Sequence, residues 1–268
     1  MAATDSSAGK RPSSIWLSAR PPVKRKAEQP AGLDLDKIVT ATVRLLDAEG
    51  LAKFSMRRLA AELGVTAMSV YWYVNTKDDL LEFALDSVMG EMRLPDESAP
   101  DRDWRDHLRE LAGEYRNLMI AHPWSSRLVG TYINIGPHSI AFSNASLRVM
   151  KESGLSLDQI SGALAAVFQF VYGFATVEGL FNARCAEAGV SVDTYFHQVM
   201  AAVQDRPEFA ETMENSTKVM EARGGSTVEE MRDRDFAFAL DLQIAGIEAL
   251  RDRGDDRGPG SPEGTRPE

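Results

Sequence analysis

The stretch SMRRLAAELGVTAMSVYWY, residues 55–73, decides the fold that this sequence predicts. Apolar residues recur at helical spacing on both sides of Gly64, and Ser55 is a residue type that favours the start of a helix. A helix–turn–helix needs a small residue in its turn and apolar residues that lock the two helices where they cross. Those locking positions are filled by Leu59, Leu63, Val65 and Val70. The stretch therefore predicts two short helices, over 55–63 and 66–74, joined by a tight turn.

The second of these helices begins with side chains that suit contact with DNA bases. In a helix–turn–helix protein, the second helix enters a major groove with its leading residues against the base edges. The leading residues here are small or flexible: Thr66, Ala67, Met68 and Ser69. Arg57 and Arg58, at the start of the preceding helix, are placed to reach a base or a phosphate. The alternative for this pair is solvated surface charge, whereas an exposed methionine on so short a helix favours a contact.

Regular helical patterns flank this stretch. Residues 35–49 carry apolar side chains at three- and four-residue spacing, and Gly50 follows where the end of a helix needs a positive φ. Thr76 with Asp79 forms a capping box, which predicts the start of another helix. Prolines and polar residues over 94–101 indicate a domain boundary.

The rest of the chain predicts helices and no series of strands, so the fold class is all-α. Ser156 with Gln159 is a second capping box, at the start of a long helix. The polar, glycine-interrupted stretch 186–231 predicts one or two short helices. The other expected helices cover 103–121, 124–130, 138–152, 157–184 and 233–251.

These patterns divide the chain into four expected parts. The two folded parts are a three-helix helix–turn–helix domain over 33–94 and a larger helical domain over 101–253. Residues 1–32 are rich in Ser, Pro and basic residues and predict a disordered basic arm, and 254–268 predict a disordered tail.

Composition and charge narrow the class of protein. The chain has 268 residues, of which 44% are hydrophobic, and a formal net charge of −10. Residues 1–77 contain twelve Lys or Arg and seven Asp or Glu, so a cationic section (+5) precedes an anionic remainder (−15), as in a DNA-binding domain joined to a body with another task. Cys185 is the only cysteine, which excludes a disulfide framework and a CxxC metal or redox site. We find no apolar run of membrane-spanning length and no signal peptide, which predicts a cytoplasmic protein without a membrane partner.

Residues 35–85, LDKIVTATVRLLDAEGLAKFSMRRLAAELGVTAMSVYWYVNTKDDLLEFAL, resemble the DNA-binding domain of the TetR family of bacterial transcriptional regulators. The RRLAAELGV turn, the YWY cluster and Lys77 carry the resemblance. The remainder resembles the C-terminal domain of the tetracycline-repressor class, in which a long helix such as 157–184 and a terminal helix such as 233–251 form a dimer bundle.

The resemblance implies a role for each matching residue. Arg57 matches a position that contacts guanine, for which the guanidinium fork is suited. Met68 matches an apolar contact to a thymine methyl group, flanked by Ala67 and Ser69. Ala67 replaces a residue that can hydrogen-bond a base, so the operator sequence is expected to differ. Tyr71 and Lys77 match phosphate-contacting positions, and Trp72 and Tyr73 match positions that buttress or touch the DNA backbone. Helix packing would also explain the three aromatic residues. For Trp72 we favour partial burial.

The basic arm has two interpretations. A flexible cationic segment before the first helix can enter the adjacent minor groove, and its candidates are Arg20, Lys24, Arg25 and Lys26. The alternative is a solubilising tail without a DNA contact.

In this class the long helices also form the wall of an effector pocket, although aromatic residues at helical spacing are more typical of a core. A small-molecule site mixes apolar walls with a few polar groups. The candidates for an effector site are Trp104, Tyr132, Asn134, Phe142, Gln169, Tyr172 and Glu178. Tetracycline itself is not favoured, because residues 126–131 lack the histidine through which the tetracycline repressor binds a magnesium chelate. The histidines of this chain lack the sequence spacing of metal ligands, so we predict no metal site and no cofactor.

The resemblance, together with these patterns, implies a homodimer that binds double-stranded operator DNA and is released by a small-molecule effector, that is, a repressor. Two other classes compete with it. An enzyme is disfavoured because the chain has no GxSxG, GxGxxG, P-loop or HExxH motif. A helical protein-interaction module would use the same two helices to grip another protein, and the salt dependence of binding would distinguish it from a DNA reader.

Overall fold

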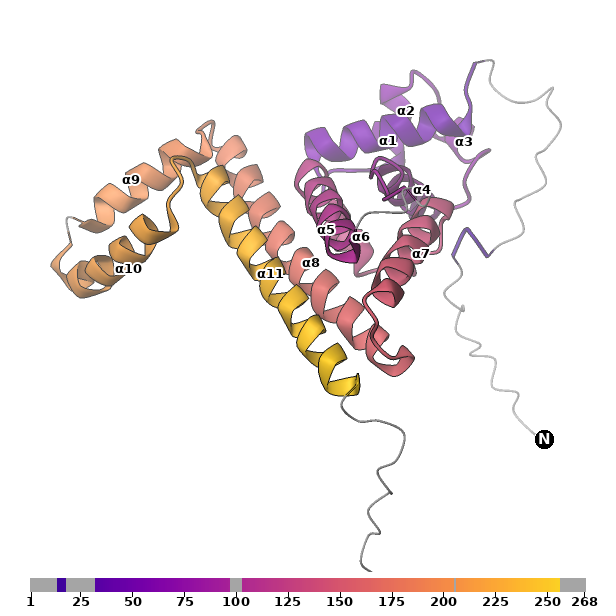
Figure 1. Ribbon diagram of the computed structural model, residues 1–268. Helices are drawn as coiled ribbons and strands as arrows, with labels where there is room; N and C mark the ends of the chain where they lie inside the picture. Colours follow the sequence, from indigo (N-terminus) through magenta and orange to yellow (C-terminus); the bar gives the residue numbers. More distant parts are fainter. Residues whose placement is uncertain (1–13, 18–31, 97–102, 205, 256–268) are drawn as a thin grey trace, which may run out of the picture. The chain divides into compact units, whose positions relative to one another are not determined.

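The computed structural model describes residues 14–17, 32–96, 103–204 and 206–255, and in these ranges the regular structure is helical throughout (Figure 1). The helices are α1 (Leu35–Glu49), α2 (Met56–Glu62), α3 (Ala67–Val70), α4 (Lys77–Met89), α5 (Trp104–Ala121), α6 (Ser125–Val129), α7 (Pro137–Glu152), α8 (Leu157–Glu187), α9 (Val192–Gln204), the 3₁₀ turn η2 (Pro207–Phe209), α10 (Ala210–Arg223) and α11 (Val228–Asp255). The all-α prediction is confirmed. The expected tail lies outside the described residues except for its first two positions.

The first of two compact units contains residues 1–92 and 124–142. Asp34 caps α1 by accepting a hydrogen bond from the Lys37 amide at 2.8 Å, and the expected capping box of Thr76 and Asp79 opens α4. Helices α1 and α4 pack against each other, and α2 packs against both α1 and α3 (Figure 1). The core of this unit includes the fully buried side chains Ile38, Leu46, Leu59, Val70, Leu80 and Val88.

Residues 124–142 join this unit although they follow α5 in the chain. The Trp124 indole donates a hydrogen bond to Asp47 of α1 at 2.7 Å. Asp86 of α4 accepts hydrogen bonds from the amides of His138 and Ser139 at the first turn of α7. A Cβ at Gly136 would lie 2.2 Å from the Asp86 carboxyl carbon, so this close approach requires glycine. The boundary expected from the sequence would place residues 124–142 with the C-terminal half. The structure places them in the first unit instead, through contacts between parts of the chain that are distant in sequence.

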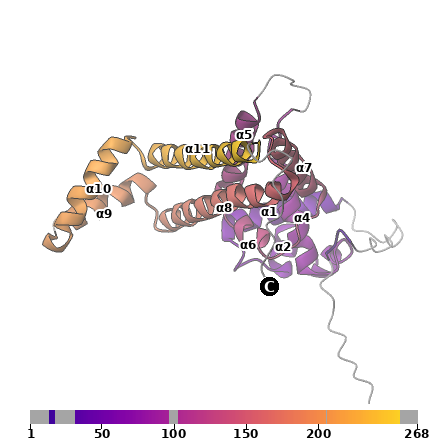
Figure 2. The ribbon, with the colours of Figure 1, turned by 60° about the horizontal axis from the view of Figure 1, so that its bottom comes forward.

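The second unit contains residues 93–123 and 143–268. Helix α5 lies along α8, and α8 runs beside α11 over much of its length (Figures 1 and 2). Helices α9 and α10 form a hairpin beyond the end of the α8–α11 pair, and neither contains a buried residue. The core lies between α5, α7 and α8, with buried Leu108, Leu111, Met119, Met150, Val167 and Val171.

Three elements differ from the sequence-based expectation. Helix α3 is only four residues long, because turns replace the helix from Tyr71 onward. Helix α11 begins five residues earlier than expected. Helix α8 has no charged residue between Asp158 and Glu178. By length and composition alone it could cross a membrane, so the expectation that no apolar run reaches that length was wrong. A single helix of this kind is weak evidence for a membrane span.

Candidate nucleic-acid interface

Helices α2 and α3 are held at a fixed crossing by their caps and by the turn between them. The Ser55 hydroxyl accepts a hydrogen bond from the Arg58 amide, and the Thr66 hydroxyl accepts one from the Ser69 amide. In the turn, Gly64 has φ +66°, and the Val65 amide donates to the Ala60 carbonyl at 2.9 Å. These contacts form the helix–turn–helix that residues 55–73 predict.

Because Gly64 lies in the left-handed region, replacing it is expected to strain the turn. We expect Gly64→Ala to reduce the free energy of unfolding by about 1–2 kcal/mol, the cost of an L-residue in this conformation. The matched control is Gly113→Ala within α5, where nothing lies within 4 Å of an added Cβ and φ is not positive. There alanine is expected to stabilise by roughly 0.5–1 kcal/mol. Chemical denaturation at equal protein concentration measures both, and a stabilising effect at Gly64 would contradict the assigned turn.

The surface of α3 projects a methionine and a tyrosine away from the domain. Met68 is 69% exposed and Tyr71 is 43% exposed, whereas Val70 between them is fully buried. The Thr66 hydroxyl lies 3.0 Å from the Ser69 hydroxyl, and Ala67 beside them is half-buried. The exposed side of α3 therefore combines an apolar side chain with small polar groups close to the backbone, a surface that can approach base edges.

The two arginines of α2 have different surroundings. Arg58 is held by two carboxylates, with Nη2 2.6 Å from Glu49 Oε1 and Nη1 3.1 Å from Glu62 Oε2, and its hydrogen bond lowers the pKa of Glu62. Arg57 is exposed and has no ion pair within the part of the chain that the structure describes. The sequence analysis does not identify Glu49 and Glu62 as partners of Arg58, although the four-residue spacing of Arg58 and Glu62 is a signal for an ion pair on a helix.

Some of the residues that follow α3 make hydrogen bonds within the first unit. The Tyr73 hydroxyl donates to the Leu33 carbonyl at 2.6 Å, and partial burial raises the pKa of this phenol. Lys77 Nζ donates to the Phe54 carbonyl at 2.9 Å and lies 5.3 Å from the centre of the Phe54 ring. Trp72 is half-buried, as we favoured from the sequence. These contacts connect the residues after α3 to the start of α1 and to the segment before α2.

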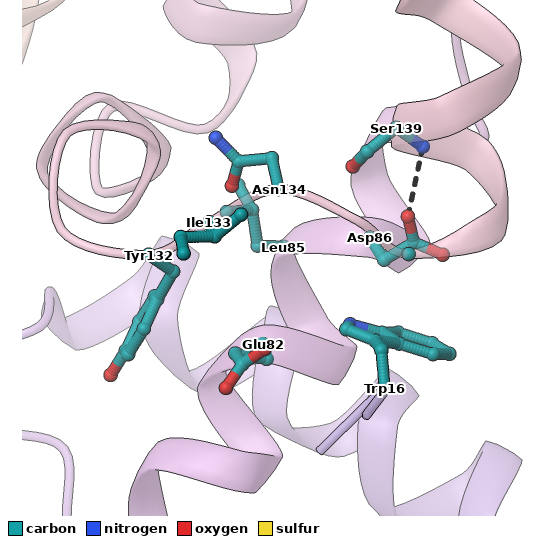
Figure 3. A pocket seen from close by; sticks show the side chains of 9 residues that line it. Trp16, Glu82, Leu85, Asp86, Tyr132, Ile133, Asn134 and Ser139 are labelled. Carbon is teal, nitrogen blue, oxygen red and sulfur yellow. Dashed lines mark hydrogen bonds between the residues drawn. The ribbon is translucent and has the colours of Figure 1, made fainter. Parts of the chain in front are cut away.

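Two of the expected effector residues lie together in a small cleft of the first unit (Figure 3). Tyr132 and Asn134 form one side of it, and Glu82 and Asp86 of α4 form another. The Tyr132 hydroxyl donates to Asp78 at 3.1 Å, and burial, followed by this hydrogen bond, raises the pKa of the phenol. The Asn134 amide donates to the Val129 carbonyl, while its carbonyl oxygen is buried without a partner among the described residues.

The structure does not bring the other five effector candidates into this cleft. Trp104 and Phe142 are buried, and Tyr172 is half-buried in α8. Gln169 is exposed on α8. Glu178 is buried in an ion pair, so the interpretation of this carboxylate as an open ligand group lacks structural support.

Glu178 belongs to a network that joins three helices of the second unit. Arg116 of α5 donates two hydrogen bonds to Glu178 of α8, at 2.9 and 3.1 Å, and a third to Asp233 of α11 at 2.7 Å. Its guanidinium carbon lies 4.8 Å from the centre of the Phe236 ring. The Arg116 and Glu178 side chains are only 9% and 6% exposed, so water screens their attraction little.

Two further expectations concern the arm and metals. Arg20, Lys24, Arg25 and Lys26 lie outside the described residues. Within the described ranges, no group of three or more His, Cys, Asp or Glu side chains could hold a metal ion. His122 is the C-cap of α5.

A capped helix–turn–helix with an exposed second helix, followed along the chain by a larger helical unit, is an architecture typical of DNA-binding transcriptional regulators. Residues 38–84 match the family described as bacterial regulatory proteins, tetR family, and residues 94–251 match the tetracyclin repressor-like C-terminal domain. The chain belongs to the TetR family of ligand-responsive transcriptional regulators.

Relatives of known name agree with this assignment. An HTH-type transcriptional regulator of Saccharopolyspora erythraea is 39% identical over 171 residues, which cover 64% of this chain and 70% of that protein. The HTH-type transcriptional repressor DrrR1 of Streptomyces coeruleorubidus is 34% identical over 161 residues, 60% of this chain and 58% of the relative. The class E tetracycline repressor protein of Escherichia coli is 27% identical over 153 residues, 57% of this chain and 72% of the relative.

Solved structures share the fold. ActR from Streptomyces coelicolor without ligand superposes with a TM-score of 0.65 at 25% identity, covering 84% of this chain and 99% of ActR. BioQ bound to its double-stranded DNA operator superposes with a TM-score of 0.53 at 21% identity, covering 81% of this chain and 99% of BioQ, which shows the fold alone.

Proposed function

We propose that this protein is a homodimeric, cytoplasmic repressor that occupies an operator through α3 and leaves it when a small molecule binds. One observation carries the proposal: the helix–turn–helix leaves Met68 of α3 and Arg57 of α2 exposed, while the residues that hold its two helices together are buried. Solvent-exposed methionine on a rigid, one-turn helix has little value for folding and suits an apolar contact with DNA.

The DNA contacts divide into base-reading and backbone-positioning groups. We assign Arg57, Thr66, Ala67, Met68 and Ser69 to the base edges, and Tyr71, Trp72, Tyr73 and Lys77 to the phosphate backbone or its support. Lys77 has three N–H donors, so its bond to the Phe54 carbonyl leaves two for a phosphate. Arg58 supports the domain through Glu49 and Glu62 instead of reading a base. The arm residues Arg20, Lys24, Arg25 and Lys26 are proposed for the adjacent minor groove.

A second copy of the chain is proposed to cover the apolar surface of α8 and α11. Both helices carry large hydrophobic side chains that the chain itself leaves open: Leu157, Val177 and Leu180 on α8, and Phe238, Leu242 and Leu250 on α11. Exposed apolar side chains on two neighbouring helices are suited to burial against another protein chain. Such burial also explains the apolar length of α8 without a membrane. The two α3 helices of a dimer are expected to lie about 34–36 Å apart on DNA, one helical turn.

The effector is proposed to be a small molecule without a metal or cofactor. ActR, whose fold this chain shares, has been solved in complex with actinorhodin and with (S)-DNPA. Within this chain, Tyr132 and Asn134 are the candidate residues that line a cleft together. Binding there would shift the population toward conformations whose recognition helices do not fit the operator.

DNase footprinting on the DNA upstream of the protein's own gene, followed by a screen for small molecules that release it, tests this function. We expect a protected palindromic site and an affinity that falls steeply with salt, because each neutralised phosphate releases counterions. Binding that ignores salt and requires another protein would favour an interaction module instead. Substrate turnover without DNA would favour an enzyme.

A further inference from the structure

The short segment Ser14–Leu17 is bound to the surface of α4. Ile15 is 7% exposed, and Trp16 meets Phe83 edge to face, with ring centres 5.0 Å apart. The Ser14 hydroxyl and the Ile15 amide both donate hydrogen bonds to the Glu82 carboxylate. Leu17, by contrast, is 73% exposed. Three consecutive residues therefore make the specific contacts, and the fourth does not.

Glu82 depends on this segment for its hydrogen bonds. The residue is 6% exposed, and its donors among the described residues are Ser14 and Ile15. A buried carboxylate is costly without hydrogen-bond donors, and the segment that contacts Glu82 also supplies two of them. The segment supplies what the site requires: an aromatic ring against Phe83 and two N–H or O–H donors for Glu82.

The same segment forms part of the cleft that holds Tyr132 and Asn134. Trp16 and Glu82 line it together with Asp86, Ile133 and Ser139 (Figure 3). Its lining includes two carboxylates and no lysine or arginine. The carbonyl oxygen of Asn134 is a further acceptor, buried without a partner among the described residues. An occupant with hydrogen-bond donors and a positive charge would therefore complement the cleft better than an anion.

We propose that Ser14–Leu17 is a removable strap over a ligand site on α4, and that the ligand is a small aromatic amine. The ring takes the place of the Trp16 indole beside Phe83, and the ammonium group takes the place of the Ser14 and Ile15 donors at Glu82. The strap and the ligand compete for the same atoms, so each lowers the occupancy of the other. The role of this ligand as an effector rests on the proposed function, whereas its binding does not.

Competition sets the size of the expected effect. When the binding-competent state is only a fraction of the population, the apparent affinity falls by that fraction. A strap docked in about nine of ten molecules weakens ligand binding roughly tenfold. Removing the Trp16 ring removes the contact of the strap with Phe83, leaving Ile15 as its buried apolar residue, and also enlarges the cleft.

Tryptamine is a suitable probe, because it combines an indole ring with an ammonium group. Isothermal titration of the full-length protein is expected to show binding about tenfold tighter for Trp16→Ala than for the unaltered protein. The matched control Leu17→Ala changes an exposed residue of the same segment and is expected to leave the affinity unchanged. Adding Glu82→Gln to Trp16→Ala is expected to abolish the gain, because the amide lacks the charge that pairs with ammonium. Equal affinity for all variants, or no binding by Trp16→Ala, would overturn the proposal.

Hydrogen exchange tests the strap without a ligand. We expect Trp16→Ala to increase the exchange rate of the amides of residues 14–17 by at least tenfold over Leu17→Ala, while the amides of α1 remain protected; equal exchange in the two variants would contradict docking. Operator binding by the unaltered protein, measured in parallel, reports the proposed function separately. A protein that binds tryptamine through Glu82 but no DNA would retain the ligand site and lose the effector role.

Discussion

Replacing Arg116 with alanine is expected to destabilise the second unit by about 3–5 kcal/mol, the usual cost of removing one partner of a buried ion pair. The substitution would leave the Glu178 carboxylate buried in α8 without the two hydrogen bonds that the guanidinium donates. It would also remove the contact with Asp233 and the cation–π contact with Phe236, so that α5, α8 and α11 lose a shared anchor. Urea denaturation at fixed protein concentration measures the change.

Arg109→Ala is the matched control, because Arg109 lies on the same helix and also pairs with two carboxylates, Asp106 and Asp241. All three side chains are 44–57% exposed, so the expected loss is below about 1 kcal/mol. The double variant Arg116→Met with Glu178→Met replaces the buried pair by apolar groups and is expected to be more stable than Arg116→Ala. If Arg116→Ala and Arg109→Ala cost the same, burial of the pair would not be the source of its effect.

Arg57→Ala is expected to weaken operator binding by about 1–3 kcal/mol, which is the discrimination of a bidentate arginine–guanine contact. The loss is expected to be specific to one base pair, so a change at that position should weaken the unaltered protein and leave the variant unaffected. Because Arg57 is exposed and has no ion pair among the described residues, the free energy of unfolding should stay within about 0.5 kcal/mol. Fluorescence anisotropy on operator variants measures the affinity.

Lys218→Ala provides the charge-matched control for Arg57→Ala. Lys218 is an exposed residue of α10 that pairs with Glu214, and its removal also subtracts one positive charge from the chain. If both substitutions weaken DNA binding equally, the effect comes from net charge, and Arg57 does not read a base.

Local signals in the sequence predicted most of the helices. Helix α1 covers the residues that its periodicity predicts, and the capping boxes at Thr76 and Ser156 open α4 and α8 where expected. Caps, glycine ends and apolar spacing act within a few residues, so they can be recognised without knowledge of the fold. The exposed Met68 and the helix–turn–helix around Gly64 follow from the same short-range patterns.

Partners distant in the chain could not be predicted in this way. Arg57 and Arg58 are adjacent and chemically alike, yet only Arg58 has carboxylates on both sides, one of them contributed by α1. From the sequence, Glu178 is a candidate ligand-binding residue. In the structure its carboxylate is paired with Arg116, which lies 62 residues away in the chain. Tyr132 and Asn134 meet a cleft whose opposite side comes from α4 and from Trp16.

The sequence by itself determined most of the helices and the position of the helix–turn–helix, because these features depend on neighbours along the chain. Only the tertiary structure decided which charged side chains remain available to a partner. Which charged side chains remain available depends on which groups the fold places within hydrogen-bonding distance of one another. A buried carboxylate such as Glu82 or Glu178 requires donors, and these come from residues that are distant in the sequence.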